Sequence, residues 1–192
     1  MEKTLSALFG SLLLATSVAE GQFNYTTNAD GCSITITGYS GAGGAVIIPA
    51  VINGRPVTGL GADAFYLCTK VTSITIPGSV RSMGDYAFYE CTGLTNVIIA
   101  NGFTSIGYGA FFRCTGLSSV TIPVSVTNIG SCSFFHCLRL TRLCFRGDAP
   151  AAGPSVFSSD TKATVYYLPG TTGWSSIFSG RPTVLNEPGA KL

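Results

Sequence analysis

A 23-residue pattern repeats through the middle of this 192-residue chain. The segment 94–116, LTNVIIANGFTSIGYGAFFRCTG, has a close copy directly before it (VTSITIPGSVRSMGDYAFYECTG) and another directly after it (LSSVTIPVSVTNIGSCSFFHCLR). A fixed period of this length indicates a solenoid, in which each repeat forms one turn of a coil and contacts its neighbours. Columns of similar residues recur at this spacing: Val57, Val80, Phe103 and Val126; Leu60, Met83, Ile106 and Ile129; Gly61, Gly84, Gly107 and Gly130; Phe65, Phe88, Phe111 and Phe134; Cys68, Cys91, Cys114 and Cys137.

Each repeat contains a short alternating segment that predicts a strand. In the central repeat, Val97 and Ile99 share one face of the segment while Ile98 faces the other way. Stacked in parallel about 4.8 Å apart, such strands form a sheet along the coil. Few residues remain for the return path, so we expect short helical or 3-10 turns there. The prediction is a strand-rich α/β solenoid with a curved parallel sheet, one short strand per repeat, and those turns on the convex side.

The two ends of the solenoid depart from the repeat. Two strand-like segments, FNYTTN and CSITITGY, flank a turn at residues 29–31 and predict a β-hairpin cap with a connector in residues 20–45. The solenoid itself is expected over residues 46–169, with a five-residue insertion between residues 50 and 56. Residues 170–192 are expected to form a C-terminal cap and a tail, with Trp174, Ile177 and Phe178 folding over the last turn.

Residues 1–19 have the pattern of a secretory signal peptide. Lys3 precedes the apolar stretch from Leu5 to Ala15, and Ser17-Val18-Ala19 forms a small-residue cleavage site before Glu20. A buried N-terminal helix is the alternative interpretation. The mature chain is therefore expected to be secreted or at the cell surface, with the periplasm also possible, and to have no transmembrane segment. A net charge of +2 does not favour nucleic acid as a partner.

The repeats resemble the bacterial leucine-rich repeats of the BspA type, also called the Treponema pallidum type, whose pattern is close to LTSITIPxSVTSIGxxAFxxCxG. Residues 71–93, 94–116 and 117–137 match it almost throughout, with Ala100 and Ser133 as departures. The resemblance implies a leucine-rich-repeat solenoid that is usually exported or surface-located. Members with known roles are mostly adhesins or ligand-binding surface proteins.

The residues indicate no enzyme, metal site or cofactor. Stacked cysteines in register lie within the Cα separation that a disulfide allows, but their parallel side chains suit its dihedral angle poorly. We therefore predict buried free thiols, although Cys132 and Cys137 lie in one repeat and could pair. A row of thiolates along a coil is not a tetrahedral metal site. The single histidine, His136, falls in a variable column and is expected to be exposed without a catalytic role.

The remaining candidate is the open, concave face of the sheet. We expect a non-catalytic, monomeric binding module that recognises a protein or glycan there, and Arg and Tyr are common binding hot spots. The alternatives are a merely solvated sheet face, and a structural spacer or surface-layer element without a specific ligand. The predicted binding residues are Thr75, Asn96, Ile98, Thr121, Arg142, Arg146 and Tyr167, of which the last three are the strongest anchors.

Overall fold

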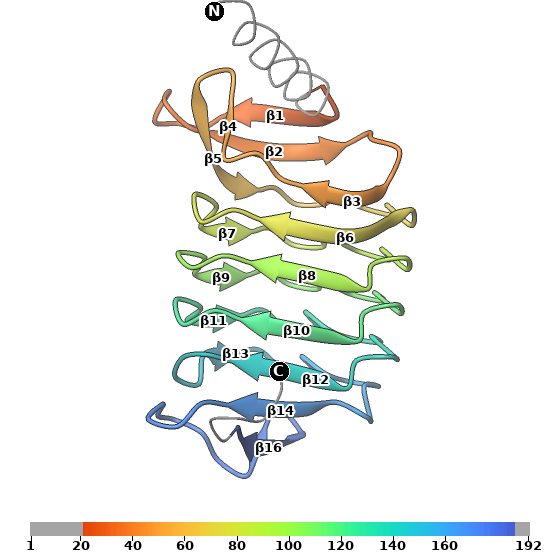
Figure 1. Ribbon diagram of the computed structural model, residues 1–192, viewed down its shortest axis with the longest axis vertical. Coiled ribbons are helices and arrows are strands. Elements are labelled where there is room, and N and C mark those ends of the chain that lie inside the picture. Colours follow the sequence, from red (N-terminus) through yellow and green to blue (C-terminus); the bar gives the residue numbers. More distant parts are fainter. Residues whose placement is uncertain (1–20, 187–192) are drawn as a thin grey trace, which may run out of the picture.

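The computed structural model describes residues 21–186, and these form a strand-rich solenoid whose turns are stacked along one axis (Figure 1). The predicted signal peptide at residues 1–19 and the end of the predicted tail, residues 187–192, lie outside the described residues.

One parallel layer, here called the front sheet, contains the strands predicted from the repeat. It pairs in the predicted 23-residue register, for example Ile74 with Val97 and Thr75 with Ile98. Val97 is buried and Ile98 is 52% exposed, so the predicted alternation is confirmed. The front strands are β3 (Gly44–Ile47), β6 (Val71–Ile76), β8 (Asn96–Ile99), β10 (Ser119–Ile122), β12 (Arg142–Phe145) and β14 (Thr164–Tyr167).

Each complete turn also contributes a second, short strand, so the expectation of one strand per repeat is wrong. This rear sheet consists of β5 (Arg55–Leu60), β7 (Ser82–Met83), β9 (Ser105–Ile106), β11 (Asn128–Ile129) and β13 (Ala151–Ala152), joined in parallel. The glycine column follows it and permits close stacking: a Cβ on Gly107 would lie 2.5 Å from a backbone atom of Gly84. The column therefore serves close backbone approach, because Gly84 and Gly107 do not have a positive φ.

The return path of each turn contains no α-helix or 3-10 helix within residues 21–186, which corrects the predicted helical turns. Residues in the left-handed region, such as Asp63 (φ 56°) and Leu67 (φ 57°), recur along it and interrupt any helical run. Its amides instead donate to the next turn, as when Phe65 N–H bonds Ala87 O at 2.7 Å and Leu67 N–H bonds Tyr89 O at 2.9 Å. The amides between them close isolated turns, as when Tyr66 N–H bonds Asp63 O at 2.9 Å, so the return path alternates between bonds to the next turn and single local turns.

Stacked phenylalanine rings fill the interior. The ring centroids of Phe88 and Phe111 are 5.2 Å apart with nearly parallel planes, and Phe65, Phe134 and Phe157 extend the stack in both directions. These rings are essentially fully buried. Each buried phenylalanine stabilises the fold by roughly 1.5–3 kcal/mol, and the stack links successive turns.

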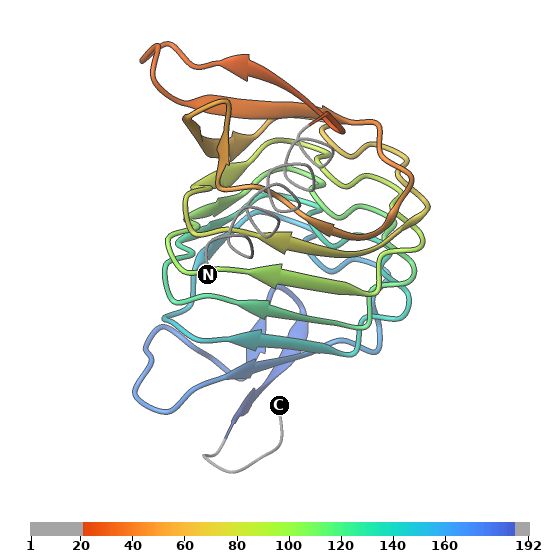
Figure 2. The ribbon, with the colours of Figure 1, turned by 45° about the horizontal axis from the view of Figure 1, so that its top comes forward.

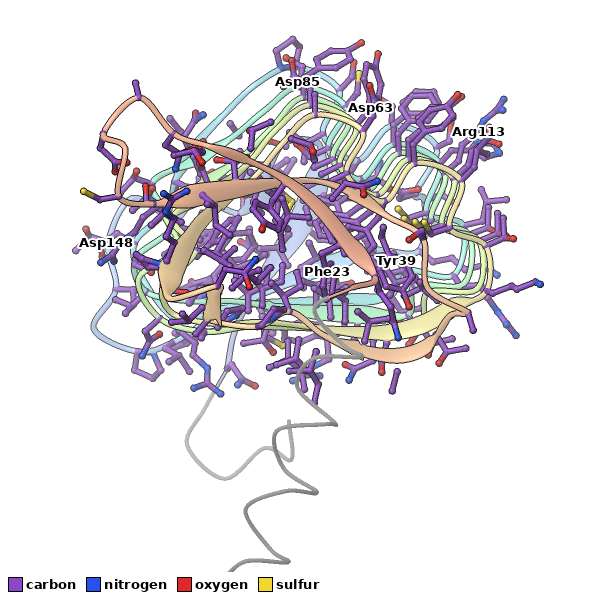
Figure 3. All side chains as sticks on the ribbon, turned by 90° about the horizontal axis from the view of Figure 1, so that it is seen from above. Phe23, Tyr39, Asp63, Asp85, Arg113 and Asp148 are labelled. Carbon is purple, nitrogen blue, oxygen red and sulfur yellow. The ribbon has the colours of Figure 1, made fainter. Side chains whose placement is uncertain are left out.

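The N-terminal hairpin covers one end of this stack. Strand β1 (Phe23–Thr27) pairs antiparallel with β2 (Ile34–Tyr39), and β2 pairs in parallel with β5. Tyr39 stacks on Phe65 with 5.1 Å between the ring centroids, and Phe23 meets Phe65 edge-on at 6.4 Å. Figure 2 shows the hairpin lying across the end of the coil, and Figure 3 shows Phe23 and Tyr39 over its interior.

The predicted insertion forms a second hairpin. Strand β4 (Val51–Ile52) pairs antiparallel with β5. The two linking residues, Asn53 (φ 49°) and Gly54 (φ 74°), both lie in the left-handed region, as a type I′ hairpin turn requires.

A third hairpin, β15 (Ile177–Phe178) with β16 (Arg181–Leu185), lies at the C-terminal end. Strand β16 extends the front sheet beyond β14. Trp174 packs edge-on against Phe145 with centroids 5.0 Å apart, and Phe178 lies 5.6 Å from the same ring. Ile177 is 60% exposed, so the expectation that it folds over the last turn is wrong.

Candidate functional site

Four of the seven predicted binding residues belong to β6, β8 and β10 and face outward from the front sheet, on the surface here called the front face. Arg142 of β12 shares this face and is described below. Thr75 and Ile98 are register partners on adjacent strands, and Asn96 and Thr121 occupy other outward positions on β8 and β10. Asn96 and Ile98 are exposed, whereas Thr75 and Thr121 are partly buried. The alternation of the strands is sufficient to place these four residues.

The front sheet is divided by a seam between β8 and β10. Strands β3, β6 and β8 form one hydrogen-bonded ladder, and β10, β12, β14 and β16 belong to another. The rear sheet and the return path stay continuous across the same two turns, as Ser105 pairing with Asn128 and Gly109 N–H bonding Ser131 O at 2.9 Å show. The seam is therefore a local opening on the front face and not a division between two domains.

Both ends of the seam lack a hydrogen bond that the neighbouring turns make. Thr95 N–H donates to Thr72 O at 2.9 Å and Thr141 N–H donates to Ser118 O at 3.0 Å, but Ser118 N–H makes no such bond to Thr95 O. At the other end, Pro123 has no N–H to offer Ile99 O. The corresponding residues of the adjacent turns, Ala100 and Arg146, do donate across the turns.

A pocket of about 290 Å³ lies over this seam. Strands β8 and β10 form its walls, and Pro123 and Arg146 lie at the β10 and β12 ends. Arg146 N–H bonds Ile122 O at 3.0 Å, which holds the residue at the end of β10. The lining contains four of the predicted residues, Asn96, Ile98, Thr121 and Arg146, together with Asn101 and Ser119.

Arg142 was expected to be an anchor for a ligand, but its guanidinium already has partners within the chain. It lies over the ring of Tyr166 at 4.0 Å from the centroid. It also donates to Cys144 Sγ at 3.2 Å and to Asn186 Oδ1 at 3.3 Å. The side chain is half-buried and holds the end of the front sheet together, so it is not available as a free cation.

Tyr167 does not lie on the front face, which corrects its predicted orientation. Two residues separate the buried Leu140 and Leu143, but only Thr164 separates the buried Ala163 and Val165. This one-residue shortening shifts the register, so that Tyr167 pairs with the inward Phe145. Its ring stacks on Trp174 at 5.2 Å, and Tyr166 takes the outward position instead.

Two polar residues of the pocket lining, Ser119 and Asn101, are not among the seven predicted binding residues. Ser119 lies two residues before Thr121 in β10, so the alternation of the strand puts both side chains on the front face. Asn101 lies just after β8, where the repeat has no strand. Nothing in the repeat pattern indicates that Asn101 reaches the pocket, because the seam itself is not a repeated feature.

A second aromatic ladder follows the outside of the return path. Tyr89 and Phe112 stack with centroids 5.3 Å apart, and Tyr66 and Phe135 extend the row. Beside it, Arg113 donates to Glu90 at 2.8 Å, and this hydrogen bond holds the pKa of the Glu90 carboxyl below its usual value. Figure 3 shows Arg113 at the outer edge of the coil. The 23-residue spacing of these rings could have revealed the ladder in the sequence.

The described residues offer no arrangement suited to catalysis. Burial raises the pKa of the Cys91 thiol to about 12, and that of Cys114 and Cys137 well above its usual value. All seven cysteines are free, as predicted, and Cys132 does not pair with Cys137. Burial holds for Cys91, Cys114 and Cys137 of the column, whereas Cys68 is only half-buried. His136 is half-buried beside Phe135 and makes no side-chain hydrogen bond within residues 21–186.

Neither a metal site nor a membrane span is present in the part of the chain that the structure describes. No group of three or more His, Cys, Asp or Glu side chains is arranged there to hold a metal ion. The same residues include no helix with the length and apolar character needed to cross a bilayer.

Comparison with known proteins identifies the repeat. Residues 52–177 match the family described as BspA type Leucine rich repeat region, in six copies. No curated protein matches the chain. The comparisons indicate no enzymatic family.

Solved structures of bacterial leucine-rich repeat proteins share the fold. A Treponema pallidum leucine-rich repeat protein is 31% identical with a TM-score of 0.72, over 76% of this chain and 69% of that one. A leucine-rich repeat protein from Bacteroides capillosus is 33% identical with a TM-score of 0.53, over 57% and 83% of the two chains. A leucine rich cell surface protein from Faecalibacterium prausnitzii is 26% identical with a TM-score of 0.50, over 77% of this chain and 53% of that one.

Proposed function

The chain belongs to the BspA-type leucine-rich repeat family, and we propose that it is an exported module that recognises a protein or a glycan on its front face. Leucine-rich repeat domains are in general non-catalytic recognition modules. The observation that carries the proposal is the front face itself, where the seam pocket brings together Asn96, Ile98, Thr121 and Arg146. A solenoid presents such a face as one extended surface, which suits a large ligand.

The chemistry of the front face favours recognition over a purely structural role. Ile47 and Ile98 are 72% and 52% exposed in the outward column, and small polar residues surround them. A surface of this kind offers a ligand both apolar contacts and hydrogen-bonding groups. A spacer without a ligand is the second candidate, and it requires neither a pocket nor an unpaired cation such as Arg146.

Export is proposed from two observations. Residues 1–19 have the signal-peptide pattern, and a similar solved structure from Faecalibacterium prausnitzii is named a cell surface protein. Expression in a bacterial host followed by N-terminal sequencing of the processed protein should give Glu20 as the first residue. Retention of residues 1–19 on a protein that stays inside the cell would contradict export.

Binding is tested on an array of glycans and host matrix proteins probed with the chain from residue 20 onward. Thr75→Arg and Ile98→Arg add bulk and charge to the front face, whereas Thr92→Arg makes the same change at an exposed position of the return path. Circular dichroism and size-exclusion chromatography first establish that each variant is folded and monomeric.

The proposal expects selective capture of one ligand class by the wild type and the Thr92 variant, and its loss in both front-face variants. Capture that is equally strong in all variants would remove the front face as the site. Self-association or unselective weak capture would instead favour the spacer.

A further inference from the structure

We propose that the seam pocket binds the carboxylate of an acidic sugar, with Arg146 as the counterion and the walls of β8 and β10 as partners for the sugar hydroxyls. The inference rests on the proposed function, because it names the ligand chemistry of one site on the front face.

The charge of the pocket points to an anion. Arg146 is the only charged residue in the lining, and it is exposed. Within residues 21–186 its guanidinium forms no salt bridge and no side-chain hydrogen bond, unlike that of Arg142. The nearby Asp148 does not line this pocket, and its carboxylate accepts Thr172 N–H at 2.6 Å. A guanidinium in this situation suits a carboxylate, which it can bind through two parallel hydrogen bonds.

The neutral lining points to hydroxyl groups beside that carboxylate. Asn96 and Asn101 contribute amides, and Ser119 and Thr121 contribute hydroxyls. Each of these groups can both donate and accept, which is what a row of sugar hydroxyls requires. None of the four side chains hydrogen-bonds another described residue, so all four are available to a ligand. Ile98 adds an exposed apolar contact for the face of a sugar ring.

The size of the pocket limits how much of a ligand it can hold. Its volume of about 290 Å³ is just below the roughly 300–1,000 Å³ of typical ligand sites, which suits one or two sugar rings. The seam adds one backbone group to the lining, since Ile99 O lacks the cross-turn hydrogen bond that Ile76 O and Ile122 O accept. A longer acidic glycan would have to continue along the front face.

The test is an NMR titration of ¹⁵N-labelled chain, residues 20–192, with galacturonate trisaccharide. The methyl ester of the same trisaccharide retains the ring hydroxyls and removes the charge. The capped peptide acetyl-Asp-Gly-Asp-Gly-Asp-amide supplies three carboxylates without a sugar. Arg146→Gln removes the cation at the pocket, and Arg139→Gln removes an exposed arginine from the return path as the matched control. Thr121→Val removes one wall hydroxyl with little change in shape.

The expected result is that the trisaccharide shifts the amide signals of Asn96, Ile98, Ser119 and Thr121. Arg146→Gln and the methyl ester should each weaken binding at least tenfold, Thr121→Val should weaken it severalfold, and Arg139→Gln should leave it unchanged. Equal affinity for the ester, an unaffected Arg146→Gln variant, or tighter binding of the peptide would each overturn the inference.

The two proposals fail in different ways. If the array finds an uncharged or protein ligand that Ile98→Arg abolishes and Arg146→Gln does not affect, the acidic-sugar site is wrong and front-face recognition stands. If no ligand of any class is captured by the front face, both are wrong.

Discussion

The Sγ atom of Cys91 lies 3.0 Å from the carbonyl oxygen of Phe65, 26 residues earlier, and its thiol donates a hydrogen bond to that oxygen. Cys114 makes the same bond to Phe88 and Cys137 to Phe111, each at 3.1 Å. Each of these carbonyls also accepts a backbone N–H of its own turn, as Phe65 O does from Cys68 at 3.1 Å, so the cysteine column supplies a second hydrogen-bond partner across the turns.

Replacing one of these thiols should destabilise the solenoid. Cys114→Ala leaves Phe88 O without its thiol partner and opens a small cavity, so we expect a loss of about 1–3 kcal/mol in the free energy of unfolding. Urea denaturation followed by circular dichroism measures it. Cys32→Ala, at an exposed cysteine, should change stability by less than about 0.5 kcal/mol. Equal effects of the two substitutions would show that the buried hydrogen bond does not contribute.

The same burial should protect the thiols from alkylation. The raised pKa of Cys91, Cys114 and Cys137 keeps these thiols protonated, and the thiolate is the reactive form. Iodoacetamide at pH 8 should modify Cys32, which is exposed, and leave these three unmodified until denaturant is added. Peptide mass spectrometry of the native protein is the measurement. Rapid native labelling at Cys114 would contradict the buried position.

Asp160 should make stability depend on pH. It occupies the next position of the cysteine column, and burial raises the pKa of its carboxyl to about 7 from a usual value of 3.8. The backbone of Cys137 in the preceding turn and the Arg181 side chain of β16 both stabilise the ionised carboxylate of Asp160. Their combined effect on its pKa is smaller than the opposing effect of burial. The folded chain therefore binds a proton that the unfolded chain has released between about pH 3.8 and 7.

Because the unfolded chain binds fewer protons in that window, stability should fall as pH rises from about 4 to 7 and then level off. The loss is on the order of 1.4 kcal/mol for each pKa unit of the shift. Asp160→Asn retains the shape without titrating, so thermal unfolding of this variant should lack this decrease. A wild type and an Asn variant with parallel pH profiles would rule out Asp160 as its source.

The glycine column should not tolerate a side chain. A Cβ on Gly107 would lie 2.5 Å from backbone atoms of Gly84, and those atoms belong to a paired turn that cannot move aside easily. Gly107→Ala should cost more than about 2 kcal/mol, or prevent folding. Ser105→Ala in the adjacent strand β9, where the side chain is partly exposed, serves as the control in the same denaturation experiment. A stable Gly107→Ala variant would mean that the turns are spaced more widely than described.

Part of the candidate site could be predicted from the sequence, and part could not. Asn96, Ile98 and Thr121 follow from strand alternation alone, because alternate residues of a strand always point to opposite faces. Tyr167 was assigned to the wrong face because a single missing residue before Val165 reverses the orientation of every side chain that follows. Arg142 was assigned to the correct face, but Tyr166 and Asn186, which bind its guanidinium, come from segments that the repeat does not align with it.

The sequence by itself determined the period, the buried columns and the strands of the front sheet, because each is a local pattern that recurs every 23 residues. Only the tertiary structure decided how the turns join. In the structure, the return path forms hydrogen bonds between turns instead of helices. The front sheet is interrupted between β8 and β10, whereas the rear sheet is continuous across the same turns. The physical reason is that backbone pairing depends on which donors meet which acceptors across neighbouring turns. This can differ from one turn to the next without disturbing the period, as where Pro123 has no N–H to offer Ile99 O.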